Sequence, residues 1–349
     1  LHGDADDNVP VEQARTMIKA LEGHPNLQWH EQKGANHWWD ADPAPGADAV
    51  DWKPGFDLFR KTQLPEASIT VDFLTPDPWI SSTCRWARIG EQEKALEASS
   101  VNLRMNYREV VGTTQNVLSL AINLPILTGV TLDGQTIAVN GVGPYGFFKE
   151  AGKWRAVPLS SVVAVPRGAK SVFANHVCFV VGTAGSRDEQ EATRELAQFW
   201  AENYWYRGNA GVEVITDREA INRGLAAGGG NVVLFGNADN NRLWKLWGPK
   251  FGLQVNSGRL ASEGHSASGP DFAATALADL GRGRVVLGVG GTGPNGIRLA
   301  ARSPIFTSGA AYPDVLAWNP SMLTSGADGI VLAGFLSGPH TAADIVWRD

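Results

Sequence analysis

The sequence predicts a protein of mixed α/β class with an antiparallel β-rich segment in its middle, and three observations support this prediction. Hydrophobic residues make up 43% and charged residues 19% of the 349 residues, a balance that is apolar enough to bury more than one core. The 40 glycines follow no fixed period, as expected for many tight turns. The hydrophobic pattern changes twice along the chain, from helix and strand to short alternating strands and back. Because single cores stop growing at about 250 to 300 residues, we expect two or three domains.

The composition argues against several classes of protein. A net charge of −6 leaves no basic stripe to neutralise phosphates, so we expect no nucleic-acid partner. No window of about 18 uncharged apolar residues occurs, so we expect no membrane span. The two cysteines, Cys84 and Cys178, exclude a disulfide scaffold and a cysteine-rich zinc module but leave one disulfide possible. The histidines lack a metal-ligand spacing such as His-x-x-x-His, and we expect neither a metal nor another cofactor.

Residues 1–62 predict a loop, a helix, a strand, a loop and a second helix, which together form a piece of an α/β layer. Pro10 precedes apolar residues at helical spacing, and Gly23 ends that run. Residues 27–30 are predicted to form a short strand, and residues 56–59 a helix that docks through its aromatic side chains. Between them the chain is broken by three turn-forming residues, Pro43, Pro45 and Gly46.

Residues 63–158 predict a small antiparallel β-rich domain. Two hairpins are explicit in the sequence. Asp133-Gly134 accepts the positive φ angles of a type I′ turn, and Phe147-Phe148 is predicted to pair with Trp154 across residues 150–152. Further short apolar or alternating runs, each bounded by turns, cover residues 69–73, 101–107 and 117–124.

Residues 159–349 predict strands and helices in alternation, which is typical of a Rossmann-like α/β extension. Two helix starts carry the capping-box pattern, Ser186 with Glu189 and Thr216 with Glu219. A further short helix is predicted at residues 243–246. The predicted strands cover residues 178–181, 212–215, 231–235, 285–289 and 330–333.

The opening motif carries the strongest functional signal. His2-Gly3-x-x-Asp6 is followed by Asn8-Val9-Pro10 and, after the next predicted strand, by Gly34-x-x-His37. This pattern resembles the end of the catalytic domain in the prolyl oligopeptidase family of α/β-hydrolase serine peptidases. The resemblance implies that Asp6 is the triad acid and His37 the triad base, each in a loop after a strand. From spacing alone, Asp6 as a cap of the first helix and His37 as a surface residue remain open, and Asp4 and Asp7 are rival acids.

Two tryptophans next to the predicted base, Trp38 and Trp39, are candidates for lining a substrate pocket, and docking against a neighbouring domain is their alternative role. The resemblance implies a serine-type peptidase or hydrolase that acts on peptides or small esters. It also favours an extracytoplasmic location. Residues 69–73 and 231–237 resemble the long C-terminal extension of some bacterial members of the family.

The nucleophile is expected outside this sequence. In this fold the serine of a Gly-x-Ser-x-Gly elbow precedes the acid and the histidine in chain order. The sequence starts at Leu1 without a secretory leader pattern, so we expect it to begin within a domain and its partner to be an upstream hydrolase segment that carries the serine. Gly264-His265-Ser266-Ala267-Ser268 nearly matches the elbow but is predicted to be a polar loop. The alternative function is a non-catalytic binding or assembly module built on the two C-terminal parts.

Two further patterns have structural alternatives. Gly288-x-Gly290-x-x-Gly293 formally matches a dinucleotide-binding fingerprint, but Pro294 follows where a helix should start, which favours a glycine-rich turn. An aromatic cluster is either a platform for sugars or peptides or part of the core, and the helical spacing of its first two members favours the core. The cluster consists of Trp200, Tyr204, Trp205, Tyr206, Trp244 and Trp247.

Overall fold

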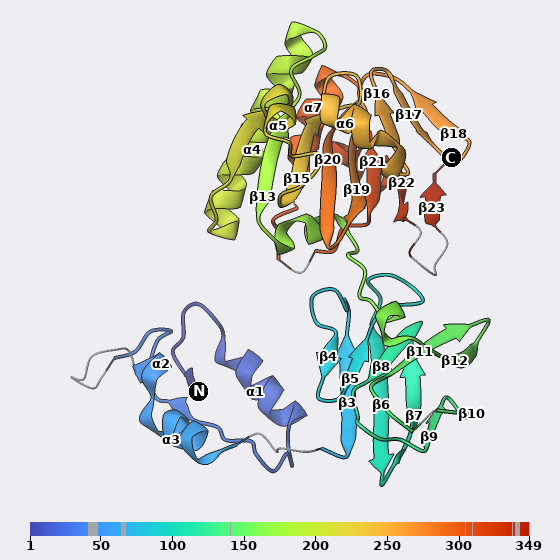
Figure 1. Cartoon of the computed structure of the whole chain (residues 1–349). Coiled ribbons are helices and arrows are strands. Elements are labelled where there is room, and N and C mark those ends of the chain that lie inside the picture. Colours follow the sequence, from blue (N-terminus) through green and yellow to red (C-terminus); the bar gives the residue numbers. More distant parts are fainter. Residues whose placement is uncertain are drawn as a thin grey trace. The chain divides into compact units, whose positions relative to one another are not determined.

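The protein is of mixed α/β class with several separate sheets (Figure 1). The computed structural model describes residues 1–40, 48–63, 68–139, 141–303, 305–308, 310–336, 338 and 343–348. It divides into two compact units, Leu1–Ser68 and Ile69–Asp349. The predicted chain break at Pro43, Pro45 and Gly46 lies outside the described residues.

The described residues of the first unit form two very short parallel strands and three helices. The predicted helices are present as α1 and α3, but the strand predicted at residues 27–30 is wrong. The strand forms instead at Glu31–Gln32, immediately after the predicted range, where the backbone pairs with His2–Gly3. Among the described residues of this unit, the buried apolar side chains are Val11 and Ala35. The elements are β1 (His2–Gly3), α1 (Val11–Ala20), β2 (Glu31–Gln32), α2 (Asp48–Asp51) and α3 (Lys53–Lys61).

The second unit begins with two five-stranded sheets around one apolar core. Side chains from both sheets meet in that core, among them Val101 and Leu103 from one and Ile122 and Phe147 from the other. One sheet has the order β10-β9-β7-β6-β3 and the other β12-β11-β8-β5-β4. The strands are β3 (Thr70–Thr75), β4 (Thr83–Cys84), β5 (Ala87–Ile89), β6 (Ser99–Asn106), β7 (Glu109–Gln115), β8 (Ser119–Ile122), β9 (Gly129–Leu132), β10 (Gln135–Ile137), β11 (Tyr145–Glu150) and β12 (Lys153–Val157).

Both predicted hairpins are present, but the predicted pairing of Phe147-Phe148 with Trp154 is wrong, because these two residues lie opposite Ala156 and Arg155. Asp133 and Gly134 have φ angles of 51° and 81° and join β9 to β10. Ala151 and Gly152, with φ angles of 47° and 76°, join β11 to β12, where Trp154 lies opposite Lys149. Asp133 and Gly134 suit the first turn, whereas in the second turn Gly152 accepts positive φ readily and Ala151 adopts it against its usual preference.

The unit continues with an eight-stranded mixed sheet of order β14-β13-β15-β20-β19-β21-β22-β23. The first four strands are parallel neighbours, and the others pair antiparallel. A separate three-stranded sheet has the order β16-β17-β18. The strands are β13 (Val177–Val181), β14 (Glu213–Thr216), β15 (Asn231–Gly236), β16 (Gln254–Asn256), β17 (Arg259–Ser262), β18 (His265–Ser268), β19 (Ala273–Gly281), β20 (Arg284–Gly291), β21 (Val315–Trp318), β22 (Ile330–Phe335) and β23 (Asp344–Trp347).

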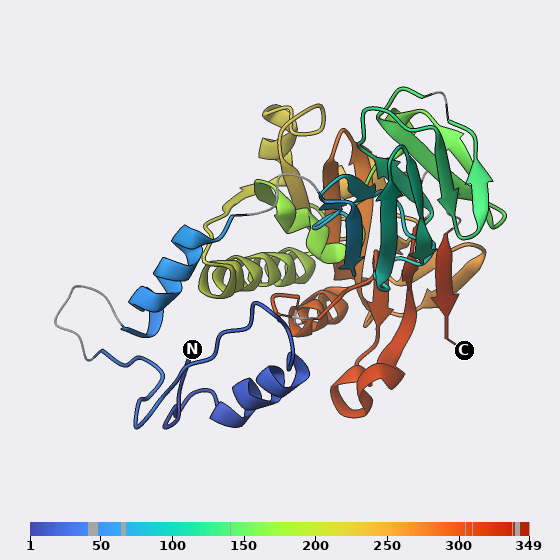
Figure 2. The ribbon, with the colours of Figure 1, turned by 90° about the horizontal axis from the view of Figure 1, so that it is seen from below.

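Helices cover both faces of the eight-stranded sheet. The long helix α4 and the short α7 pack side by side and share one core with the sheet, whereas α5 and α6 contribute to the core on the opposite face (Figure 2). The α-helices are α4 (Arg187–Gly208), α5 (Asp217–Asn222), α6 (Arg242–Trp247), α7 (Pro294–Leu299) and α8 (Met322–Ser325). Short 3-10 helices cover Leu159–Ser161, Ala169–Ala174, Gly248–Lys250, Ala300–Arg302 and Gly326–Gly329.

Local sequence explains where the main helix begins and ends. The Ser186 hydroxyl accepts a hydrogen bond from Glu189 N, and the Glu189 carboxylate accepts one from Ser186 N, so the predicted capping box is confirmed. Asn209 ends α4 in the left-handed conformation, with a φ of 49°. Thr216 likewise caps α5 by accepting from Glu219 N. No helix in the described part of the chain is both long enough and apolar enough to cross a bilayer.

Candidate functional site

The two residues predicted as acid and base lie together in the first unit. Asp6 follows β1 and His37 follows β2. Because these strands pair in parallel, the loops after them leave the same edge of the sheet. The loops approach so closely that a Cβ atom on Gly3 would collide with the carbonyl oxygens of Ala35 and Asn36. Glycine at position 3 therefore allows the two loops to meet.

The Asp6 carboxylate is held by hydrogen bonds to both oxygens. Its Oδ2 lies 2.9 Å from His37 Nδ1, and its Oδ1 accepts bonds of 2.8 Å from the backbone N–H groups of Asn8 and Val9. The Asp6 side chain is 4% exposed and that of His37 is 31% exposed. Helix α1 begins at Val11, and its N-cap residue Pro10 makes no side-chain cap, so Asp6 orders the preceding loop and does not cap the helix.

The rival acids have other surroundings. Asp4 accepts a hydrogen bond from Gly34 N and so joins the same two loops at a different point. Asp7 is exposed. Among the three neighbouring aspartates, Asp6 is the one bonded to the His37 ring in the described part of the chain.

The surroundings of Asp6 favour its charged form. Burial of the carboxyl opposes ionisation, but hydrogen bonds from Val9 N, His37 and Asn8 N outweigh it and lower the pKa of Asp6 to about 2. Asp6 is therefore a fixed anion at neutral pH. An anion beside Nδ1 favours the tautomer that carries its proton on Nδ1, which leaves Nε2 of a neutral ring free to accept a proton.

A second imidazole lies against the same carboxylate. His2 Nε2 is 2.9 Å from Val9 O and 3.4 Å from Asp6 Oδ2. Its hydrogen bond fixes the loop whose N–H groups hold Asp6, and its ring meets Asp6 at ion-pair distance. The sequence pattern includes His2 in the opening motif but does not predict its contact with Asp6. The four-residue spacing from His2 to Asp6 gives no periodic signal, because a two-residue strand passes directly into a turn within it.

The two predicted substrate-binding tryptophans differ in exposure. Trp38 is 65% exposed and packs edge-on against the His37 ring, with 5.2 Å between the ring centroids. Trp39 is half-buried. Trp38 is thus placed to contact a molecule that approaches His37.

The internal near-match to a nucleophile elbow has a different structure from the one predicted. Residues 264–268 were predicted to be a polar loop, but His265–Ser268 form β18, the edge of the three-stranded sheet. Ser266 pairs with Ala261 in the middle of an antiparallel ladder. A nucleophile elbow is a sharp turn from strand to helix, and Ser266 does not occupy one. The polar, exposed strand lacks the apolar alternation that would have identified it.

The glycine-rich segment that runs from the end of β20 to α7 also corrects a prediction. We expected Pro294 to prevent a helix start, but α7 begins at Pro294, because the first helical position does not need its N–H. The glycines are explained by close packing within the chain. A Cβ atom on Gly288 would lie 2.6 Å from the Trp244 ring, and one on Gly290 would collide with Gly236 O.

The predicted aromatic cluster is mainly interior. Trp200 and Trp244 are each 1% exposed and Trp247 is 6% exposed. Tyr204 packs against the same core as Trp200, which confirms the core interpretation for these two helical neighbours. Trp205 and Tyr206 are exposed.

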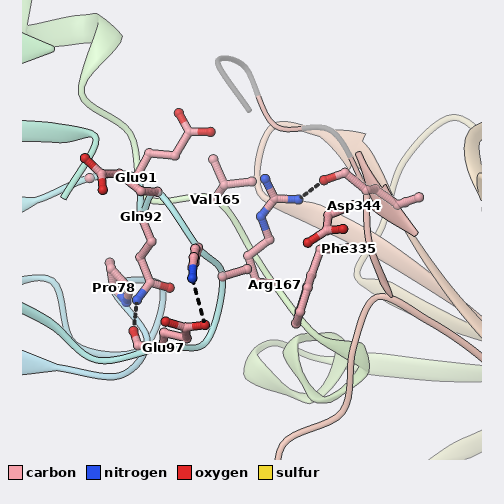
Figure 3. Close-up of a pocket in the computed structure, with 13 residues that line it drawn as sticks. Pro78, Glu91, Gln92, Glu97, Val165, Arg167, Phe335 and Asp344 are labelled. Atoms are coloured by element: carbon pink, nitrogen blue, oxygen red, sulfur yellow. Dashed lines mark hydrogen bonds and ion pairs between the residues drawn. The ribbon is translucent and has the colours of Figure 1, made fainter. Parts of the chain in front are cut away.

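A pocket of about 220 Å³ lies between the loop at residues 90–97 and the end of the mixed sheet (Figure 3). Its polar groups are largely bound to the protein itself. The Gln92 amide donates to Pro76 O, Glu97 O and Ser99 Oγ. Arg167 donates to Asp314 Oδ2 and Leu336 O. The Gln92 bonds fix the loop within the β-rich segment, and the Arg167 bonds fix the segment that leads into the mixed sheet.

Cys84 and Cys178 are both free thiols, so the disulfide left possible by the sequence is not formed. Burial raises the pKa of the Cys178 thiol to about 11, with a contribution from the neighbouring Glu213 carboxylate. No cluster of three potential metal-ligating side chains occurs within the described ranges. Comparison of the chain with protein-family models, with curated proteins and with solved structures gives no match.

Proposed function

We propose that the first unit supplies the acid and the base of a Ser-His-Asp triad in a serine hydrolase of the prolyl oligopeptidase type, acting on peptides or small esters. The observation that carries the proposal is the 2.9 Å contact between Asp6 Oδ2 and His37 Nδ1, made by a carboxylate whose other oxygen is bound by two backbone N–H groups. The acid is rigidly placed and the base keeps an exposed edge, as acyl transfer requires.

In this mechanism Asp6 orients the His37 ring and stabilises it when it becomes positively charged. His37 Nε2 takes the proton of a serine hydroxyl as the serine oxygen attacks the substrate carbonyl. The tetrahedral intermediate collapses to an acyl-enzyme when the same nitrogen gives its proton to the leaving amine or alcohol. Water then releases the acid by the reverse sequence. Trp38 and Trp39 would line the substrate side of His37.

The proposal assigns the serine to an upstream hydrolase segment, in accordance with the chain order of the fold. It also assigns the first unit to the end of an α/β-hydrolase domain. The four parallel strands β14-β13-β15-β20, with helices on both faces, favour a Rossmann-like layer for the C-terminal part.

A fluorophosphonate probe tests the catalytic assignment, because it labels an activated serine. We expect no labelling of the present chain and labelling of a longer protein that includes the upstream segment. In that longer protein, His37→Ala should abolish labelling. His24→Ala should leave it unchanged, because His24 is exposed and bonds to Asn26 N within its own turn. Labelling of the present chain, or wild-type labelling of the His37→Ala protein, would refute the proposal.

A further inference from the structure

A cavity of about 490 Å³ lies at the carboxyl ends of the parallel strands β13 and β14. Helix α4 forms one wall, and the first turn of α5 forms part of the rim. Cavities that bind small molecules typically measure about 300 to 1,000 Å³, and open α/β sheets bind ligands beyond the carboxyl ends of their strands. Size and position are therefore both those of a ligand site.

The floor of the cavity is apolar because the sheet edge is incompletely covered. Strand β14 is the edge strand, while α4 packs mainly on β13 and β15. As a result Val214 keeps 44% of its surface exposed, next to Val181 and the α4 residue Ala201 in the cavity lining. Exposed apolar surface in a concave site favours binding of an apolar group.

The charged side chains that line the cavity differ in whether they are bonded to other residues of the protein. Glu202 accepts a hydrogen bond of 2.8 Å from Gln198, and Glu219 forms a 2.6 Å ion pair with Arg223. Arg194 is exposed and makes no ion pair with any described residue. The positions four residues before and after it on α4 hold Gln190 and Gln198, and Glu191, three residues before it, makes no ion pair with it in the described structure.

The rest of the rim is closed by the protein's own bonds. Thr183 donates to the buried Asp217, which also accepts from the backbone and the guanidinium of Arg242. Burial opposes the charge of Asp217, but these hydrogen bonds outweigh it and keep its pKa below the ordinary value. An anion that enters the cavity is therefore expected to pair with Arg194, because Arg242 is already bonded to Asp217.

We propose that this cavity binds a small amphiphilic anion, a monocarboxylic acid with a hydrophobic chain. The carboxylate pairs with the Arg194 guanidinium, and the chain lies on the floor formed by Val181, Val214 and Ala201. The Arg194 guanidinium selects the acid, because it makes no ion pair with a described residue, whereas Glu219 is paired with Arg223 and Glu202, bonded to the neutral Gln198 amide, lies about two turns further along α4. The inference is independent of the triad in the first unit.

Calorimetric titration of the intact chain with octanoate, octanol and acetate tests the proposal. We expect octanoate to bind best, since octanol lacks the charge and acetate lacks the chain. Arg194→Gln should weaken octanoate binding about tenfold, as expected for loss of a partly exposed charge-assisted bond. Arg187→Gln, on the same helix but outside the cavity lining, should bind octanoate like the wild type. Val214→Asp should abolish binding by placing a charge on the floor.

Both substituted side chains in the cavity are solvent-accessible, so the variants should keep the wild-type circular dichroism spectrum. Absence of octanoate binding, equal binding of octanol, or unchanged affinity in Arg194→Gln would each overturn the proposal. Equal binding of acetate would also overturn it, because the apolar floor would then contribute nothing.

Discussion

The Asp6 carboxyl should titrate far below an ordinary aspartate. Its pKa is about 2, compared with 3.8 for an unperturbed side chain. Burial alone would raise the value, so the decrease measures how strongly Val9 N, His37 and Asn8 N hold the anion. Carbon-detected NMR of the side-chain carboxyl, followed from neutral to acidic pH, gives the midpoint directly.

Substitutions separate the contributions to this pKa. In His37→Ala the two backbone N–H bonds and the burial remain, so the pKa of Asp6 should rise towards 3.8. In His2→Ala the rise should be smaller, because the short contact of His2 is with Val9 O and its distance to Asp6 is 3.4 Å. A midpoint near 3.8 in the wild-type chain, or an unchanged midpoint in His37→Ala, would refute the described geometry.

The same shift makes folding of the first unit depend on pH. The folded-state pKa of Asp6 is lower than the unfolded value, so the unfolded chain binds more protons between the two values. The contribution of Asp6 to stability is therefore complete above about pH 4 and is lost as the pH falls from about 4 to about 2. The Asn8 and Val9 N–H groups donate to Asp6, so their hydrogen-exchange protection factors, which correct for the intrinsic pH dependence of exchange, should fall across this window.

Two further predictions concern the second unit. Trp200→Ala should lower the free energy of unfolding in urea by about 3 to 5 kcal/mol, whereas Trp205→Ala on the same helix should stay within about 0.5 kcal/mol of the wild type, because the first ring is 1% and the second 68% exposed. Equal losses would show that α4 does not bury the face described. At about pH 7.5 a maleimide should modify Cys84 and leave Cys178 unmodified until the chain unfolds, because Cys178 is buried with a pKa of about 11. Mass spectrometry of the native protein would contradict this if Cys178 reacted first.

Features encoded within a few neighbouring residues could be predicted from the sequence. The capping box at Ser186 and the turn at Asp133-Gly134 depend on contacts over three residues or fewer, and both are present. By contrast, β19 was missed because its many alanines have low β-propensity, and it exists through pairing with β20 and β21. Strand β18 was also missed, because its residues are polar and it is defined by pairing with β17 and not by an apolar pattern.

The candidate sites show the same limit. Asp6 and His37 were named from a motif, but their 2.9 Å contact depends on two-residue strands that carry no periodic signal. Asp217 bonds to Thr183, 34 positions before it, and to Arg242, 25 positions after it. No local sequence pattern predicts contacts over such separations. A sequence motif can identify which residue types are suited to a reaction. Which of these side chains come into contact depends on pairing between distant parts of the chain.

Few apolar side chains are buried among the described residues of the first unit, and this affects the stability of the Asp6–His37 contact. With Val11 and Ala35 as its buried apolar side chains, this unit has little to offset the roughly 1 to 2 kcal/mol of backbone entropy lost by each ordered residue. Such a region opens locally at a lower free energy than the large cores of the second unit. We therefore expect acid and base to separate while the rest of the chain stays folded.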